Sequence, residues 1–226
     1  MIKFQNVVKN FRRARVLDGI SLEIGLGERV ALIGSNGAGK TTLIRCLLGE
    51  YTHDGGVTIN DLDPRGNRTA VLGTIGFVPQ LPPPLKMPVG QLIDFSAALC
   101  NTNPRRIHDI AKRLGLDVED ILSRQFVRLS GGMKQKLLIA IALGREARVL
   151  VMDEPAANLD PEARKIFFDL LAEPGVIDHH LAQARPCQAQ QMPFDQGTPA
   201  HRQQRLGTGV GERSHAGGHR WGRQGG

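Results

Sequence analysis

The chain lacks a long apolar run, a pattern of paired cysteines and a signal peptide. No apolar run approaches the ~20 residues that a membrane-spanning helix needs, and Met1 leads straight into a strand pattern. The three cysteines, Cys46, Cys100 and Cys187, have neither paired nor metal-binding spacing. This usage suits a reducing cytoplasm and argues against a disulfide framework. If the protein works at a membrane, we expect another chain to supply the spanning part.

A glycine-rich motif is present near the N-terminus. Residues 34–41, G-S-N-G-A-G-K-T, fit the phosphate-loop pattern G-x-x-x-x-G-K-[ST]. Glycines let the backbone fold around an anion, so that its N–H groups and the next helix N-terminus face the phosphates. Residues 29–33 predict a buried strand before the loop, and residues 42–48 predict a helix after it. We therefore expect a nucleoside triphosphate site, with a chance glycine turn as the alternative. Its residues are Gly34, Ser35, Asn36, Gly37, Ala38, Gly39, Lys40, Thr41 and Thr42, with Lys40 on the β/γ-phosphates and Thr41 on Mg²⁺.

A second motif joins an apolar run to two acids. Residues 149–152 predict a buried parallel strand, and Asp153 and Glu154 follow it directly. Acids at the C-terminal end of such a strand lie where ligands bind in open α/β sheets. We expect Asp153 to hold the Mg²⁺ shell and Glu154 to act as general base or to orient the attacking water. The alternative is a strand-end turn with two solvated acids.

A third motif lies between the other two and opens a predicted helix that runs to about residue 143. Ser130 suits the N-cap position, and a helix N-terminus presented by glycines is an anion site. One nucleotide does not need two triphosphate cradles. We therefore expect this motif to serve a γ-phosphate that is held by another subunit. Its residues are Leu129, Ser130, Gly131 and Gly132, followed by Met133.

The identity, order and spacing of these motifs resemble those of the ABC-type ATPases, the nucleotide-binding subunits of ABC transporters, over about residues 1–173. The resemblance implies an α/β P-loop NTPase fold with a mainly parallel core sheet, an N-terminal antiparallel β part and a small helical subdomain. It also implies that Phe11 stacks on adenine and that Gln80 contacts Mg²⁺ and couples to the membrane subunit. Plain core, surface or loop roles are the alternatives for these two residues. A loop at the opposite subunit of a dimer would comprise Ala157, Asn158, Leu159 and Asp160.

The resemblance implies a function as well. ATP and Mg²⁺ would bind, and hydrolysis involving Glu154, Lys40 and Gln80 would energise a separate membrane permease. Two identical or closely related subunits would close around ATP, at the cytoplasmic face of the cell membrane and without a specific nucleic-acid partner. Residues 87–95 resemble exporter-type subunits more than importers. The alternatives are a remnant that binds nucleotide without useful turnover, or a soluble ABC ATPase that acts on DNA or ribosomes.

The resemblance ends near residue 175, before a histidine that the family places at the γ-phosphate and attacking water. The corresponding region holds Arg185, Pro186 and Cys187, and His179 and His180 come too early. Residues 176–226 contain six arginines, five histidines and no lysine, without an apolar period. We expect a low-order tail from a shifted reading frame or a rearranged 3′ end. A natural disordered tail or a basic nucleic-acid-binding tail is the alternative, although no aromatic stacking pattern is present.

The sequence thus predicts an ATPase domain at 1–175 and a tail at 176–226. Within the domain, residues 1–25 predict two strands and residues 81–129 a helical subdomain. Further elements are short strands at 57–60 and 74–78 and a helix at 162–171, whose apolar residues Ile166, Phe167, Leu170 and Leu171 are expected to face the sheet.

Overall fold

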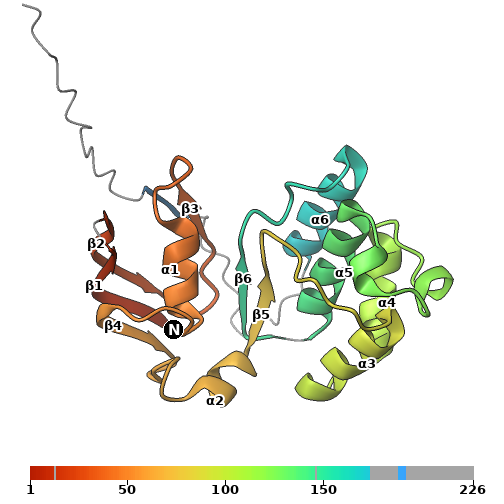
Figure 1. The fold of residues 1–226 in the computed structure, drawn as a ribbon, viewed down its shortest axis with the longest axis horizontal. Helices are drawn as coiled ribbons and strands as arrows, with labels where there is room; N and C mark the ends of the chain where they lie inside the picture. The colour runs from red at the N-terminus through yellow and green to blue at the C-terminus, as the bar shows by residue number, and fades with distance from the viewer. Residues whose placement is uncertain (13, 146, 174–187, 192–226) are drawn as a thin grey trace, which may run out of the picture. The chain divides into compact units, whose positions relative to one another are not determined.

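The computed structural model describes residues 1–12, 14–145 and 147–173, and the backbone alone at 188–191. The chain divides into two units, Met1–Phe194 and Asp195–Gly226, and every described residue lies in the first (Figure 1). The sequence predictions for His179, His180 and residues 185–187 fall outside the described residues. Within the described part, no helix is long and apolar enough to cross a membrane.

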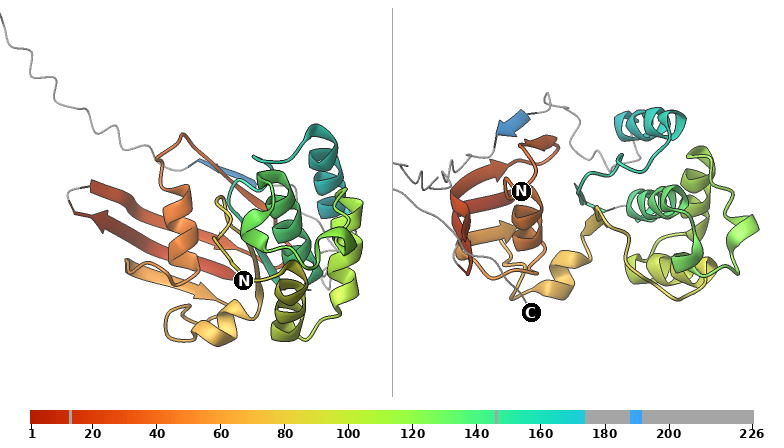
Figure 2. Two further views of the ribbon diagram at one scale, coloured as in Figure 1. Left: turned by 45° about the vertical axis from the view of Figure 1, so that its right-hand side comes forward. Right: turned by 45° about the horizontal axis from the view of Figure 1, so that its top comes forward.

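An antiparallel sheet forms the N-terminal part, as predicted. It comprises β1 (Ile2–Phe11), β2 (Ala14–Ile24) and β4 (Asp54–Ile59) in the order β2-β1-β4. Alternate residues of a strand face opposite sides of a sheet, and one face of this sheet carries the apolar set. Helix α1 (Lys40–Leu47) packs on that face, as the views in Figure 2 show. The shared core contains Ile2, Phe4, Val7, Leu43, Leu47, Val57 and Ile59.

A parallel strand pair separates two apolar cores. β5 (Ile75–Val78) pairs with β6 (Val149–Met152) in parallel. Their side chains alternate between the core that contains α1 and the core that contains α5 (Gly131–Gly144). The strand ends are therefore held from both sides. The residues in the α1 core are Ile75, Phe77, Val149 and Val151, and those in the α5 core are Val78, Leu150 and Met152.

The helical part is built around α5, whose side chains are buried along most of its length. The surrounding helices are α3 (Val89–Cys100), α4 (Pro104–Arg113) and α6 (Pro161–Ala172), with 3-10 turns at Glu119–Ile121 and Phe126–Arg128. Asn103 caps α4 through the N–H of Arg105 at 3.0 Å, and Pro104 starts the helix where its missing N–H costs nothing. Phe167 and Leu170 of α6 are buried in this core, and Ile166 and Leu171 are partly buried against it. The predicted apolar face of that helix is thus present, whereas its orientation toward the sheet stays a prediction.

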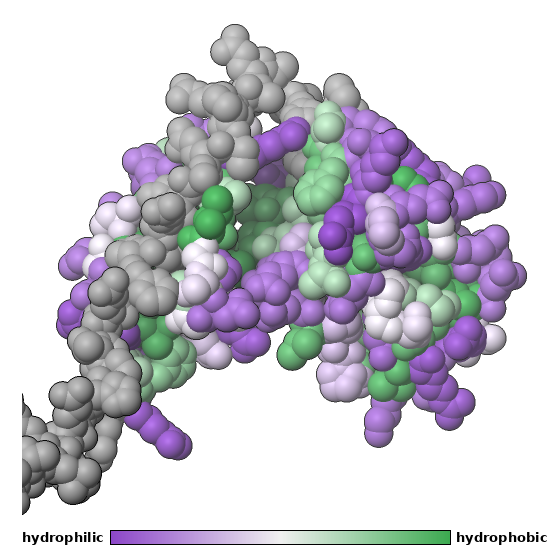
Figure 3. Space-filling view, turned by 90° about the horizontal axis from the view of Figure 1, so that it is seen from above, coloured by the Kyte–Doolittle hydropathy of each residue, from purple (hydrophilic) through white to green (hydrophobic). Residues whose placement is uncertain are grey.

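The strand before the phosphate loop is less buried than the sequence predicts. β3 (Val30–Ile33) pairs in parallel with β7 (Gln188–Gln191), and its Ile33 is 50% exposed. The strand predicted at 29–33 is therefore present, but the expectation that it is buried is wrong. Among the described residues, β7 is the sole strand neighbour of β3. The space-filling view in Figure 3 shows a hollow in the surface with hydrophobic residues inside it. The apolar run at 149–152 is also only partly buried, since Val151 is its one buried residue.

Two elements have no counterpart in the sequence analysis. Helix α2 (Arg68–Leu72) has five residues, too few to show a helical period, and buries Val71 alone. The β7 segment is glutamine-rich and carries no apolar alternation. Both elements depend on contacts with distant parts of the chain.

Candidate nucleotide site

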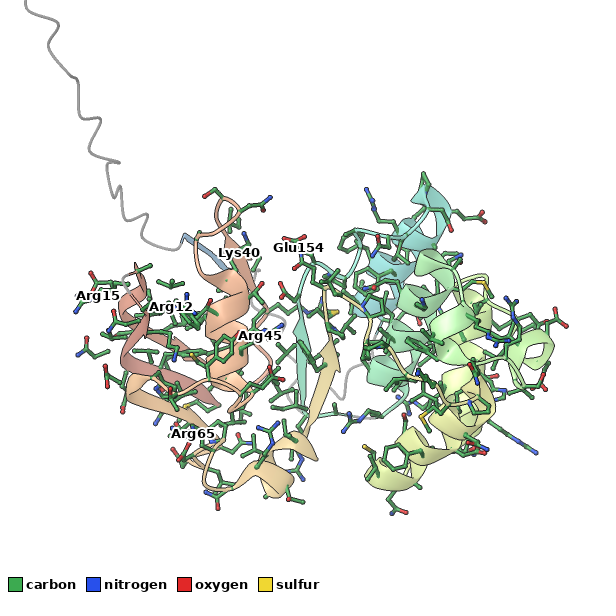
Figure 4. The ribbon with its side chains drawn as sticks, in the orientation of Figure 1. Arg12, Arg15, Lys40, Arg45, Arg65 and Glu154 are labelled. Atoms are coloured by element: carbon green, nitrogen blue, oxygen red, sulfur yellow. The ribbon has the colours of Figure 1, made fainter. Side chains whose placement is uncertain are left out.

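The phosphate loop connects β3 to α1, and Lys40 begins the helix (Figure 4). Gly39 has a φ of 91°, and a Cβ at this position would lie 2.9 Å from the carbonyl oxygen of Val16. Both facts require glycine here. Lys40 Nζ donates to the carbonyl oxygens of Gly34 at 2.8 Å and Ser35 at 3.0 Å. The ammonium is thus held over the loop, where it can exchange carbonyl oxygens for the oxygens of a phosphate.

Asp153 and Glu154 follow β6 as predicted. The N–H of Asp153 donates to the carbonyl oxygen of Val78 at 2.9 Å, which extends the β5–β6 ladder past the strand end. The side chain of Asp153 is buried, whereas Glu154 is exposed. Glu154 has a φ of 49°, a left-handed conformation that costs a non-glycine residue about 1–3 kcal/mol. The chain therefore turns sharply at Glu154 and presents its carboxylate to solvent.

Gln80 and Glu154 meet at the ends of the two paired strands. Gln80 Nε2 donates to Glu154 Oε2 at 2.9 Å, across a sequence separation of 74 residues. The parallel pairing of β5 and β6 brings both C-terminal ends to one edge, which is where ligands bind in α/β sheets. The structure thus joins two predicted site residues that lie in separate motifs.

The third motif of the sequence, residues 129–132 (the signature motif), opens α5 as predicted. Ser130 Oγ accepts a hydrogen bond from the N–H of Met133 at 3.2 Å, which confirms Ser130 as the N-cap. The Ser130 hydroxyl can still donate a hydrogen bond while it accepts this one, because a serine hydroxyl both accepts and donates. A Cβ on Gly131 would meet nothing within 4 Å, so this helix end is open. A Cβ on Gly132 would lie 3.3 Å from the carbonyl oxygen of Asn158, which brings the predicted dimer loop beside the signature.

Side-chain contacts tie α5 to the segment after Glu154. Gln135 Nε2 donates to the carbonyl oxygen of Pro155 at 2.9 Å, and Lys136 Nζ lies 2.9 Å from Asp160 Oδ2. Asp160 also caps α6 by accepting the N–H of Ala163 at 2.7 Å. This N–H first, and then the Lys136 ammonium, hold the pKa of Asp160 below its ordinary value. Helix α5 and the loop after Asp153 and Glu154 are thus joined directly.

Phe11 lies at the end of β1 and is 38% exposed. Its ring meets that of Tyr51 edge to face, with centroids 5.3 Å apart, and Lys9 Nζ lies 4.9 Å from its centroid. Sequence reasoning did not single out Lys9, Tyr51 or Gln135. Signals were present, because Tyr51 is the sole tyrosine of the chain and Gln135 is a polar residue within an apolar helix.

The predicted Mg²⁺ ligands suit an ion that is shared with a nucleotide. In the part of the chain that the structure describes, no three His, Cys, Asp or Glu residues form a group that could hold a metal ion. Thr41, Gln80 and Asp153 offer a hydroxyl, an amide and one carboxylate. Mg²⁺ is commonly bound by one or two carboxylates, with phosphate oxygens and waters completing its shell. The donor set therefore fits Mg²⁺ that arrives with a triphosphate.

Comparison with known proteins gives one consistent result. The family described as ABC transporter matches residues 17–157. The chain is 35% identical over 179 residues to the Nod factor export ATP-binding protein I of Paraburkholderia xenovorans, covering 75% of this chain and 57% of that protein. It is 36% identical over 176 residues to the sulfate/thiosulfate import ATP-binding protein CysA of Rhodopseudomonas palustris, covering 73% and 49%. The chain thus spans about half the length of these relatives.

A shorter relative and two solved structures agree. The chain is 30% identical to the high-affinity zinc uptake system ATP-binding protein ZnuC of Bacillus subtilis, covering 81% of this chain and 79% of that protein. An ATP-binding subunit of an ABC transporter superposes with a TM-score of 0.69 at 25% identity, over 76% of this chain and 73% of that one. A bacterial Atm1-family ABC exporter with ATP bound gives 0.67 at 26%, over 75% and 32%. The motifs, the fold and these matches together show that the chain belongs to the ABC transporter family, in the class of its ATP-binding subunits.

Proposed function

We propose that the chain binds and hydrolyses MgATP, and that it serves as the motor subunit of an ABC transporter. The observation that carries the proposal is the 2.9 Å hydrogen bond between Gln80 Nε2 and Glu154 Oε2. It assembles two of the predicted site residues at one sheet edge. A strand-end turn with two solvated acids would not require a partner from another strand.

The phosphate loop would bind the triphosphate. Its backbone N–H groups and the N-terminus of α1 face the anion, and Lys40 moves from its carbonyl partners to the β/γ-phosphates. Thr41, Asp153 and Gln80 would hold Mg²⁺, which neutralises charge that develops on the phosphates during transfer. Residues 34–42 form the whole of this cradle, and Phe11 would stack on the adenine.

Glu154 would act on the attacking water. Its exposed carboxylate can accept a proton from water while the water oxygen bonds to the γ-phosphorus and the bond to ADP breaks. Gln80 donates to Glu154 Oε2, so it would fix the orientation of the base. Through its proposed contact with Mg²⁺, Gln80 would also couple nucleotide binding to the membrane subunit. Glu154 is exposed directly after the end of β6, where water can reach its carboxylate.

A second subunit would complete the site. The open N-terminus of α5, with the hydroxyl proton of Ser130, suits a γ-phosphate that is bound by the partner chain. Residues 157–160 lie beside this motif and would contact the same partner. Each of the two sites would then combine the phosphate loop of one chain with the signature of the other.

A separate permease is the third proposed component. The named relatives are ATP-binding proteins of export and import systems, so they leave the exporter-like character of residues 87–95 as a prediction. With a membrane partner, the chain would work at the inner face of the cell membrane. We further propose that residues 1–175 are the ATPase domain, with residues 81–129 as its helical subdomain.

Two variants test this function by separating binding from turnover. Lys40→Ala removes the positive charge that would pair with the β/γ-phosphates, and it should weaken MgATP binding severely. Glu154→Gln keeps binding but should lower turnover by about 10²–10⁴-fold. Binding is measured with a fluorescent ATP analogue and turnover by phosphate release. Unchanged turnover in a folded Glu154→Gln chain would exclude the assigned base, and binding without turnover in the unaltered chain would favour a non-catalytic remnant.

A further inference from the structure

Phe11 belongs to an aromatic–cation cluster formed by Lys9, Phe11, Arg45, Tyr51 and Thr52. Lys9 Nζ lies 4.9 Å from the ring centroid of Phe11 and 5.6 Å from that of Tyr51, and it donates to Thr52 Oγ1 at 3.2 Å. The two rings meet at an interplanar angle of 77°. Arg45 covers the other aromatic member: its Cζ lies 5.5 Å from the Tyr51 ring, and its Nη1 donates to the Tyr51 hydroxyl at 3.3 Å.

The cluster connects the strand that carries Phe11 to the helix that follows the phosphate loop. Lys9 and Phe11 belong to β1, Arg45 belongs to α1, and Tyr51 lies in the segment between α1 and β4. The pairing of β1 with β2 is irregular on both sides of Lys9. Such irregularities re-aim side chains near ligand sites. The ring position of Phe11 is therefore set by contacts across the fold as well as by its own strand.

These contacts matter because a base binds more tightly to an aromatic ring whose position is already fixed before binding. An exposed aromatic side chain must give up rotamer freedom when a base stacks on it, and that cost is subtracted from affinity. An edge-to-face neighbour and a cation over the ring both favour one ring position. Phe11 keeps 38% of its surface exposed, so the fixed ring still offers contact area to a ligand.

We propose that Lys9 and Tyr51 are positioning residues that hold Phe11 as a platform for the purine base of the nucleotide. The inference rests on the proposed nucleotide-binding function. Because Arg45 ties Tyr51 to α1, the platform keeps a fixed place relative to the helix that begins with Lys40. The base and the triphosphate would then be bound by two sites that are connected through Tyr51 and Arg45. Neither Lys9 nor Tyr51 needs to contact the phosphates.

The test compares a ligand that has a base with one that has none. MgATP and magnesium tripolyphosphate both present three linked phosphates to the phosphate loop, but only MgATP carries the purine base. Tyr51→Leu and Lys9→Met should each raise the Kd of MgATP by about twofold to tenfold and leave that of tripolyphosphate unchanged. Tyr51→Phe keeps the ring and should bind both ligands nearly as the unaltered chain does. Lys3→Met removes another lysine of β1, whose partner is Asp61 at 3.7 Å, and should change neither Kd.

A double-mutant cycle shows whether the effect passes through Phe11. In a Phe11→Leu background, Tyr51→Leu should add no further loss of ATP affinity, because no ring remains to be positioned. Equal losses for ATP and tripolyphosphate, no loss for either, or additive losses with Phe11→Leu would each overturn the positioning role. If the unaltered chain bound neither ligand, the proposed nucleotide function itself would fail, and this inference with it.

Discussion

Gln135 shows at the residue scale how a polar side chain is kept inside an apolar helix. It is fully buried, and its Nε2 donates to the carbonyl oxygen of Pro155. Among the described residues, its Oε1 has no hydrogen-bond partner. A buried polar group without a partner costs about 1–3 kcal/mol. We infer that Gln135, from helix α5, holds the backbone of Pro155 in place and thereby positions Glu154, the residue before it.

We expect Gln135→Met to separate stability from turnover. Methionine fills a similar volume to glutamine. It removes the unpaired Oε1, which stabilises the fold, and leaves the Pro155 carbonyl without its donor, which destabilises it. Because these two effects offset, the free energy of unfolding should change by less than about 1.5 kcal/mol. Turnover should fall with little change in KM, because Pro155 directly follows Glu154, the proposed base. Urea unfolding and phosphate release measure the two effects. An unchanged kcat would contradict the role given to Gln135.

Strand β5, which precedes Gln80, approaches α5 closely at Gly76. A Cβ on Gly76 would lie 2.8 Å from the carbonyl oxygen of Ala142 and 3.1 Å from a methyl carbon of Leu150. A backbone carbonyl cannot rotate away from such a contact. The packing between strand and helix therefore depends on the absence of a side chain at this position.

Gly76→Ala should lower the free energy of unfolding by about 1–3 kcal/mol, the usual cost of an extra methyl group in a packed interior. Gly90→Ala is the matched control. It lies in α3, and its Cβ would meet Leu122 at the ordinary contact distance of 3.5 Å, so it should be neutral or slightly stabilising. Urea denaturation of both variants checks the difference. Equal stabilities would show that β5 and α5 can move apart without cost.

The first turn of α6 gives a dependence on pH. The pKa of Asp160 lies below its ordinary value of 3.8, because the carboxylate accepts the N–H of Ala163 and pairs with Lys136. A depressed pKa in the folded state means that the stabilisation is present above pH 3.8 and is lost as pH falls through the folded value. Asp160→Asn keeps an N-cap acceptor but cannot titrate.

We therefore expect the stability of the unaltered chain to fall more steeply than that of Asp160→Asn as the pH drops below 3.8. Thermal unfolding over a series of acidic buffers measures both slopes. Parallel slopes would mean that Asp160 contributes no titrating stabilisation. Glu173 has a depressed pKa beside Arg113 in both chains, so its titration cancels in the comparison.

Across the whole chain, local patterns predicted most of the described elements, α2 and β7 excepted, but not their long-range contacts. The apolar runs and the N-cap at Ser130 indicated β6 and α5, because strand and helix periods are written in neighbouring residues. The exposure of Ile33 depends on which strand lies beside β3, and that partner is remote in sequence. The contact of Gln135 with Pro155, and that of Lys9 with Tyr51, likewise follow from packing between elements.

If each nucleotide site combines parts of two subunits, two variants that are defective in different parts should complement each other in a mixture. Lys40→Ala lacks a working phosphate loop, and Ser130→Arg lacks a working signature, so neither alone should form a dimer with a slowly hydrolysed ATP analogue. A mixed pair combines the intact loop of the Ser130→Arg chain with the intact signature of the Lys40→Ala chain. Size-exclusion chromatography should therefore show analogue-dependent dimers in the mixture and none in either variant alone. A mixture that behaves as the sum of its parts, while the unaltered chain dimerises, would contradict a site shared between two subunits.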